Sequence, residues 1–223
     1  MKIYAMPYVL VPFSLLFCVY IFLEDTYRFW LATAAKLILT ATLAACLWSK
    51  VLQGNFSPVK LLFAVGMTSA IAGDYFLQYI QKDNRKFVTG IFFFVATHLC
   101  YLPALHLLFS AHWWHLIPLA ACVGIVLVLK LGGHWDTSAA DPWLSVYTVF
   151  VAATAAKGIT MLFEGPLPAG GNVLALGCIL FFLSDVVLGI WNYQKTHIAL
   201  ADLNWLFYFG GQFCIAAGAI TML

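Results

Sequence analysis

Two aspartates are the residues most able to do chemistry, because each lies deep inside a long apolar segment. Asp74 is in the segment 61–80, and Asp185 is in the segment 171–191. A charged group within hydrocarbon costs roughly 2.5–3.5 kcal/mol on insertion scales, so it predicts a functional role by default. Two acids in one apolar environment can divide the roles of proton donor and stabilising negative charge, or can form a proton relay. The sequence therefore indicates proton chemistry.

Three more polar side chains lie at a similar depth. Lys36, Asp74 and Asp185 are each six residues from one end of an apolar segment, and all three ends are on the same side of the membrane. At 1.5 Å per residue this gives a depth of about 9 Å. Tyr147 and Tyr208 lie four and five residues in from that side. Five segments are therefore predicted to bring a polar group into one layer. The plainer alternative is that these groups only bond helices together, at about 0.6 kcal/mol for each bond.

Helical spacing extends this polar layer. Residues at i, i+3 and i+4 share one face of a helix, and this rule joins Gln212 to Tyr208 and Tyr101 to His98. The segment that holds Asp74 also carries a stripe of small residues, which allows a neighbouring helix to approach closely. The stripe consists of Gly66, Ala70 and Gly73. We therefore expect the polar groups to lie between tightly packed helices.

The elements that must position these residues are membrane-spanning helices. Of the 223 residues, 64% are hydrophobic and 9% are charged, whereas soluble domains carry about 25% charged residues. A spanning helix needs about 20 apolar residues. The segments that meet this requirement are 5–23, 30–48, 61–80, 87–109, 113–131, 143–163, 171–191 and 203–223. The predicted fold class is an all-α integral membrane protein, with eight transmembrane helices around a buried polar site in a single domain, 1–223.

Two further expectations concern the organisation of these segments. The segment 5–23 is too long for a signal-peptide core and has no small-residue cleavage site after it, so we predict a retained first helix. The third and seventh segments match in one detail, because Asp74 and Asp185 are each followed three residues later by leucine. This match hints at a parallel four-plus-four repeat.

The basic residues favour one orientation. Eight spans put both chain ends on one side, side A, and the connections 1–2, 3–4, 5–6 and 7–8 on the other, side B. Side B carries six basic residues and side A three, which places side B in the cytoplasm, although the charges around the first segment favour the reverse. We predict a multi-pass protein of a bacterial plasma membrane. Lys157 lies near side A, and its ammonium group is expected to extend outwards to the surface.

Several function classes are not favoured. His106, His112 and His115 cluster near side A, and His98 is the one deep histidine, so about three converging metal ligands are lacking. We predict neither a metal nor another cofactor. A net charge of +2 without a basic stripe gives no reason to expect a nucleic acid partner. The six cysteines lie in apolar segments without C-x-x-C spacing and are interpreted as packing residues.

Four motifs in order carry a family resemblance. The third segment reads S-x-x-x-G-D-x-x-L over 69–77, and the fourth reads G-x3-F-x3-H-x2-Y over 90–101. The seventh reads F-x-x-S-D-x-x-L over 181–188, and the eighth reads Y-x-x-x-Q over 208–212. In motif order, size and number of segments the chain resembles the YhhN-like lysoplasmalogenase family over nearly its whole length. One departure is visible, because Lys36 is followed by Leu37 where that family usually has Lys-Pro.

The resemblance implies a hydrolase of the vinyl ether bond of lysoplasmalogens. The products would be a fatty aldehyde and glycerophosphocholine or glycerophosphoethanolamine, and the partner would be a lysophospholipid in the bilayer. The resemblance implies Asp74 and Asp185 as the catalytic pair. The substrate-binding candidates are Lys36, His98, Tyr101, Tyr147, Ser184, Tyr208 and Gln212.

Acid cleavage of a vinyl ether needs two differently charged groups. Protonation of the outer alkene carbon gives an oxocarbenium ion, water adds, and the hemiacetal collapses. The reaction requires one acid that is protonated near neutral pH and one negative charge, as in glycosidases. Asp74 and Asp185 can divide these roles, with Lys36 determining which one stays ionised. The sequence leaves open which aspartate is the acid.

Two other function classes fit the same residues. A proton-coupled transporter also uses paired intramembrane acids, although the sequence shows no pair of interrupted helices in corresponding positions. A non-catalytic lipid-binding helix bundle would need neither carboxyl group for chemistry. The preferred head group and the oligomeric state are not predicted.

Overall fold

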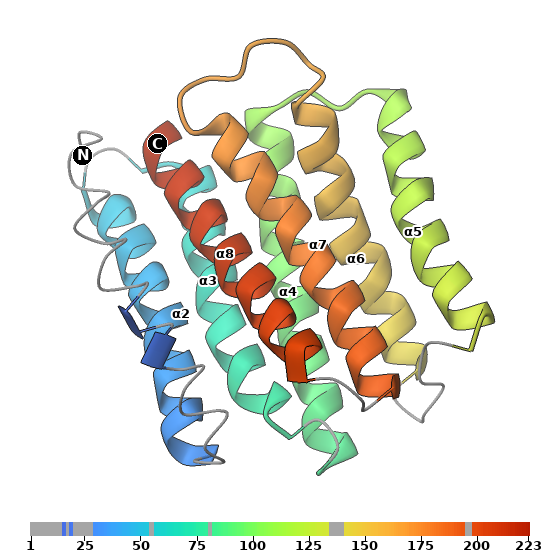
Figure 1. Ribbon diagram of the computed structural model, residues 1–223. Helices are drawn as coiled ribbons and strands as arrows, with labels where there is room; N and C mark the ends of the chain where they lie inside the picture. The colour runs from blue at the N-terminus through green and yellow to red at the C-terminus, as the bar shows by residue number, and fades with distance from the viewer. Residues whose placement is uncertain are drawn as a thin grey trace.

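The chain folds into membrane-spanning helices in the part that the structure describes. The computed structural model describes residues 15–16, 18–19, 29–53, 56–79, 82–133, 141–194 and 198–223. Within these residues, seven helices are long and apolar enough to cross a membrane, and no strand is present (Figure 1). The protein is therefore a multi-pass, all-helical membrane protein. Most of the predicted first segment, 5–23, lies outside the described residues.

The helices agree with seven of the predicted segments and differ at their ends. Their bounds are α2 Phe29–Leu52, α3 Pro58–Leu77, α4 Asn84–Leu108, η2 Trp113–His115, α5 Leu116–Leu131, α6 Asp141–Met161, α7 Gly171–Gln194 and α8 Ile198–Met222, where η2 is a short 3-10 turn before α5. The largest shift is at α8, which begins at Ile198, five residues before the predicted segment, because the helix continues through Asp202.

Local sequence explains two of the helix starts. Pro58 is in the first turn of α3, where its fixed φ suits the helix and its missing N–H costs nothing. Asp83 caps α4, because its side chain accepts hydrogen bonds from the backbone N–H groups of Arg85 and Lys86. The cap starts α4 three residues earlier than the apolar pattern predicts, at Asn84.

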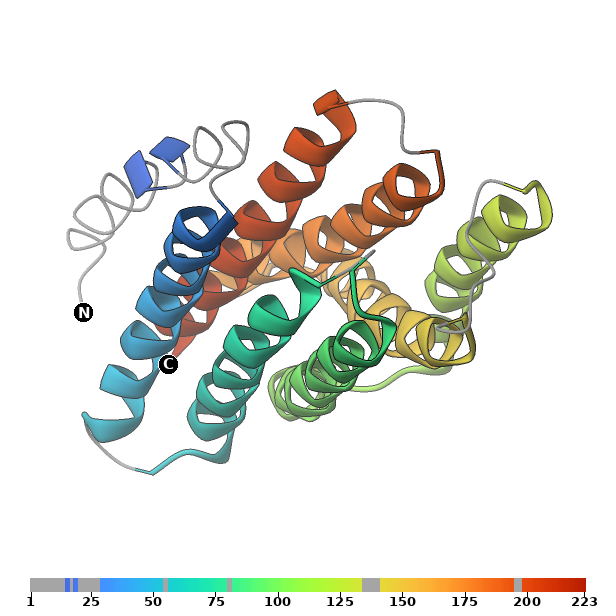
Figure 2. The same ribbon diagram turned by 90° about the horizontal axis from the view of Figure 1, so that it is seen from below.

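Six helices form a closed ring. Each packs against the next in the order α2, α3, α4, α6, α7, α8, and α8 returns to α2. Figure 2, which looks along the bundle, shows this ring, with α5 outside it next to α6. Helix α3 thus lies across the ring from α7. Because α5 contributes only Cys122 and Val126 to the buried residues of the described chain, most of its surface faces outwards.

Small residues bring α3 and α4 together, as the stripe beside Asp74 predicts. A Cβ atom on Gly66 would lie 2.7 Å from the Tyr101 ring, and one on Gly73 would lie 2.8 Å from the Phe94 ring. The aromatic side chains of α4 therefore occupy the space that side chains at these glycines would fill. The prediction of close contact is confirmed, and it fixes the face of α4 that points into the ring.

Candidate functional site

A cavity inside the ring is lined by residues from all six ring helices. It has about 450 Å³ of empty space, including its open mouth, and α5 does not contribute to it. The lining residues are Lys36, Asp74, Leu77, Phe87, Ile91, Phe94, Leu144, Tyr147, Asp185, Leu188, Asn204, Trp205 and Tyr208. The two aspartates and three of the substrate-binding candidates, Lys36, Tyr147 and Tyr208, therefore share one cavity.

Asp74 on α3 is fully buried and forms an ion pair with Lys36 on α2. Asp74 Oδ1 lies 3.2 Å from Lys36 Nζ, and Asp74 Oδ2 accepts a hydrogen bond of 2.5 Å from the Thr40 hydroxyl. Lys36 is 1% exposed, and its ammonium group also lies 4.2 Å from the centre of the Trp205 ring. The buried lysine and aspartate thus neutralise each other, which is the arrangement that a charged pair needs away from water.

A chain of side-chain hydrogen bonds lies next to Asp74. The Tyr101 hydroxyl donates to Gln212 Oε1 at 3.2 Å, and Gln212 Nε2 donates to the Tyr208 hydroxyl at 3.2 Å. Tyr208 lines the cavity together with Asp74. Tyr101 and Gln212 do not line the cavity, so the structure places them behind it.

Asp185 on α7 has different surroundings. Its Oδ2 accepts a hydrogen bond of 2.6 Å from the Tyr147 hydroxyl on α6. Within the described residues no lysine or arginine pairs with Asp185, and no second hydrogen bond reaches its carboxyl group. Asp185 is partly exposed, whereas Asp74 is sealed from solvent. The cavity therefore holds one carboxyl group with a cation and one without.

His98 lies behind the cavity, against the rings of Phe181 and Tyr147. Its Nδ1 is 2.9 Å from the Thr154 hydroxyl, which donates its own proton to the Phe150 carbonyl. His98 Nδ1 must therefore carry a proton and donate it to Thr154. His98 Nε2 is then a buried acceptor without a hydrogen-bond partner among the described residues.

Ser184 does not reach the cavity. It is 1% exposed, and its hydroxyl donates a hydrogen bond of 2.6 Å to the Phe181 carbonyl of the same helix. The serine beside Asp185 thus satisfies its hydrogen bond within α7, as serines inside membrane helices commonly do. Its assignment to substrate binding stays a prediction without a contact to support it.

Three residues at the site that carry a polar group are absent from the sequence-based candidates. Thr40 bonds to Asp74, while Asn204 and Trp205 line the cavity. Helical spacing was the available signal, because Thr40 follows Lys36 by four residues, and Asn204 and Trp205 precede Tyr208 by four and three.

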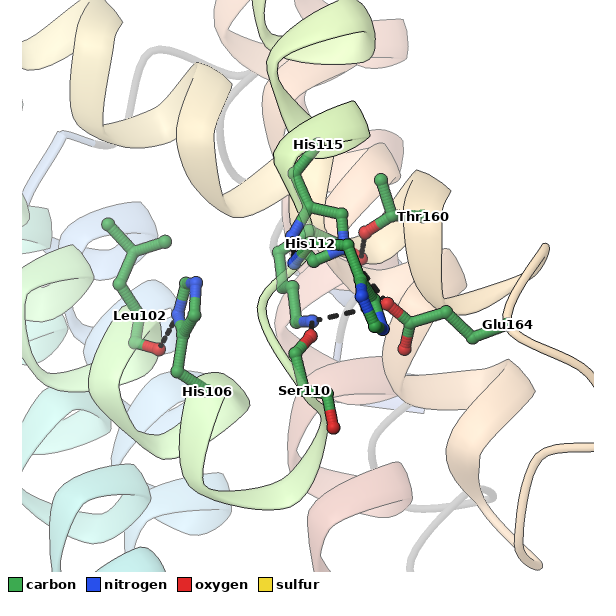
Figure 3. Close-up of polar contacts among 8 residues, drawn as sticks. Leu102, His106, Ser110, His112, His115, Thr160 and Glu164 are labelled. Carbon is green, nitrogen blue, oxygen red and sulfur yellow. Dashed lines mark hydrogen bonds and ion pairs between the residues drawn. The ribbon is translucent and has the colours of Figure 1, made fainter.

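A second polar cluster lies at the side A end, away from the cavity (Figure 3). His115 Nε2 is 2.9 Å from Glu164, and His115 Nδ1 accepts the backbone N–H of His112. Lys157 Nζ donates to the Ser110 carbonyl at 2.5 Å and lies 3.6 Å from Glu164. Lys157 points towards side A as expected, but at 2% exposure it does not reach the surface, so that part of the prediction is wrong. A backbone carbonyl and a carboxylate replace water around its ammonium group.

Comparisons with known proteins identify a family and a distant relative. The model of the YhhN family matches residues 31–219. A lysoplasmalogenase homolog from Dictyostelium discoideum is 24% identical to this chain over an alignment of 209 positions. The alignment covers 76% of this chain and 66% of that protein. The match thus spans about two thirds of the relative's length. No solved structure matches the chain.

Proposed function

Because the chain belongs to the YhhN family over residues 31–219, we propose that it is a membrane hydrolase of the vinyl ether bond of lysoplasmalogens. The products are a fatty aldehyde and glycerophosphocholine or glycerophosphoethanolamine. The distant relative named lysoplasmalogenase homolog supports this reaction class. The observation that carries the proposal is that Asp74 and Asp185, from opposite helices of the ring, line one cavity in different charge environments.

The cavity walls suit a single-chain lipid. Apolar side chains of α4, α6 and α7 form one wall, and they include Phe87, Ile91, Leu144 and Leu188. The opposite wall is more polar, because α2 and α8 supply lysine, asparagine, tryptophan and tyrosine. We assign the alkenyl chain to the first wall and the glycerol to the second.

The depth of the site fits the position of the bond. Asp74 is three residues before the end of α3 on side B, which is about 5 Å along the helix axis and less than the roughly 9 Å predicted from the apolar segment, because α3 ends at Leu77. The linkage between the tail and the glycerol of a phospholipid lies just below the head-group layer, so the reacting bond can reach Asp74 without the head group leaving the membrane surface.

The different partners assign a role to each aspartate. Asp74 has the ammonium group of Lys36 beside it and a hydrogen-bond donor in Thr40, both of which favour a carboxylate. Asp74 is therefore the negative charge that stabilises the oxocarbenium ion. Asp185 has one neutral donor, Tyr147, on Oδ2. Its other oxygen, Oδ1, is left to carry the proton that the reaction needs.

In the proposed reaction Asp185 gives up one proton and receives one back. Its carboxyl proton moves to the outer alkene carbon, and the electron pair of the double bond forms the new C–H bond. Water adds to the oxocarbenium carbon and returns a proton to the Asp185 carboxylate. The resulting hemiacetal collapses, with its hydroxyl proton transferred to the glycerol oxygen as the C–O bond breaks. One water is consumed, and both aspartates return to their starting states.

The site also supports a duplicated architecture, which we include in the proposal. Thirty-eight residues separate Lys36 from Asp74, and 38 separate Tyr147 from Asp185. The same offset of 111 residues that relates Asp74 to Asp185 relates Tyr101 to Gln212, which are hydrogen-bonded to each other. Helices α2, α3 and α4 thereby correspond to α6, α7 and α8. The predicted segment 5–23 would correspond to α5, outside the ring.

A purified-protein assay tests the proposed function. The protein in detergent is mixed with 1-alkenyl-2-hydroxy-glycerophosphocholine, and the aldehyde is measured. We expect aldehyde from this lipid and none from the 1-alkyl ether, which has no double bond to protonate. Because detergent leaves no second compartment, release cannot reflect transport. A well-folded protein that gives no aldehyde from either the choline or the ethanolamine lipid contradicts the proposal. A plasma-membrane location stays part of the prediction.

A further inference from the structure

Asn204 is a polar residue of the cavity wall whose side chain has no hydrogen-bond partner among the described residues. It lies on α8, is 4% exposed and lines the cavity. In the described part of the chain its side chain makes no hydrogen bond, whereas Lys36 pairs with Asp74 and Tyr147 with Asp185. An amide has two N–H donors and a carbonyl acceptor to satisfy. Because the described protein groups occupy none of them, they are available to a ligand in the cavity.

The amide still reaches open space. By contrast, Gln78 Nε2 and His98 Nε2 are buried atoms without a hydrogen-bond partner among the described residues, and neither residue lines the cavity. Asn204 belongs instead to the wall of the cavity. A bound molecule can therefore supply the hydrogen bonds that the protein does not.

The position of Asn204 limits which part of the substrate it can touch. It precedes Tyr208 by four residues, so the two side chains are neighbours on one helical face, with about 5–6 Å between their Cβ atoms. Tyr208 lines the cavity together with Asp74, which marks the reacting bond. Asn204 is one turn closer to the start of α8, on side B, towards the head group. It therefore lies beside the glycerol.

We propose that Asn204 binds the free secondary hydroxyl of the glycerol and so selects lysolipids over lipids with two chains. This inference rests on the proposed function. The hydroxyl is on the carbon next to the one that carries the ether oxygen. It therefore lies a few ångströms from the reacting bond on the head-group side, where Asn204 is located. It is both a donor and an acceptor, and the amide complements it in both respects.

Acylation of that hydroxyl would remove its proton and add a second chain. The amide oxygen would then lose its donor, and the chain would need space against the polar wall. A site built to hydrogen-bond a hydroxyl rejects analogues that lack it more strongly than an apolar pocket rejects an added group. The choice of a lysolipid thus follows from one buried amide.

The test compares two lipids and two variants. The lipids are 1-alkenyl-2-hydroxy-glycerophosphocholine and its 2-deoxy analogue, and the variants are Asn204→Leu and the control Leu206→Ala on the outer face of α8. We expect Asn204→Leu to lower kcat/KM for the hydroxy lipid by about 10- to 100-fold, as for one lost hydrogen bond at a buried site, and for the deoxy lipid by less than about threefold. Leu206→Ala should leave both values unchanged.

An equal loss on the two lipids would overturn the inference, because it would show a structural or head-group role. Equal use of both lipids by the unmodified protein would do the same. Binding of the uncleavable 1-alkyl ether lipids, with and without the 2-hydroxyl, separates this inference from the proposed reaction. If no aldehyde forms but Asn204→Leu still abolishes the preference for the hydroxyl in binding, the hydroxyl site stands and the reaction fails. If aldehyde forms but neither variant changes that preference, the reaction stands and the hydroxyl site fails.

Discussion

The two halves of the ring hold their aspartates in corresponding places but with different partners. In the first half, Asp74 on α3 pairs with Lys36 on the preceding ring helix. In the second half, Asp185 on α7 takes a hydrogen bond from Tyr147 on the preceding ring helix, at the same sequence separation. A cation in one half is thus replaced by a neutral hydroxyl in the other.

This difference shows how one scaffold can make two carboxyl groups unlike. Both acids line the same cavity, so their location alone does not distinguish them. The lysine and the Thr40 hydroxyl favour a charged Asp74. Tyr147 alone leaves Asp185 able to keep a proton. The roles that the sequence leaves open are therefore assigned by the neighbouring helices.

The largest effect is expected from removing either acid, and the two losses should differ. Asp185→Asn removes the proton donor and should lower kcat by at least about 10³-fold, within the range for general acids. Asp74→Asn removes a stabilising charge and should lower kcat by about 10²- to 10³-fold. Aldehyde release by purified variants that elute and unfold as the parent does would measure both. Full activity in either variant would contradict the two-acid account.

Breaking the ion pair between Lys36 and Asp74 should lower the stability of the protein strongly, because the other half of the ring has no such pair. Lys36→Met leaves Asp74 buried without its cation, which costs roughly 3–5 kcal/mol. Lys36→Met combined with Asp74→Asn should recover part of this loss, because no unpaired charge then remains. Thermal unfolding in detergent would measure both variants. If the double variant is less stable than Lys36→Met alone, the two residues do not act as a charged pair.

The smallest effect is expected from the corresponding change in the second half. Tyr147→Phe removes one neutral hydrogen bond to Asp185 and should cost about 1 kcal/mol of stability. The ring remains, so packing against Phe94 is kept. Comparison with Lys36→Met in the same unfolding assay would show whether the halves differ in charge. A loss as large as that for Lys36→Met would remove the contrast between them.

Hydropathy predicts the helices well because a membrane span must be long and apolar. The ends of the spans are less predictable, since α3 ends at Leu77, three residues before the apolar segment does, and α8 begins at Ile198, five residues before its segment. The partners of the polar residues depend on the order of helices around the ring. No spacing rule shows that Lys36 faces Asp74 instead of Asp185, or that Ser184 bonds to its own helix.

Two of the site residues that are absent from the sequence-based candidates could have been predicted from helical spacing. Thr40 and Asn204 each lie one turn from a residue that the polar layer already contains. Lys157 shows the opposite case, because its direction follows from its depth but its partners, Ser110 and Glu164, come from separate connections. Contacts between segments that are distant in the sequence cannot be predicted from a single sequence.

Isotope incorporation tests the central claim most directly. The purified protein is run in D₂O with 1-alkenyl-2-hydroxy-glycerophosphocholine, and the aldehyde is reduced at once to prevent exchange. Protonation of the outer alkene carbon predicts one deuterium at the carbon next to the former carbonyl, and Asp185→Asn should form no product above background. An aldehyde without deuterium at that carbon, or an equally labelled and equally rapid product from Asp185→Asn, would contradict the account.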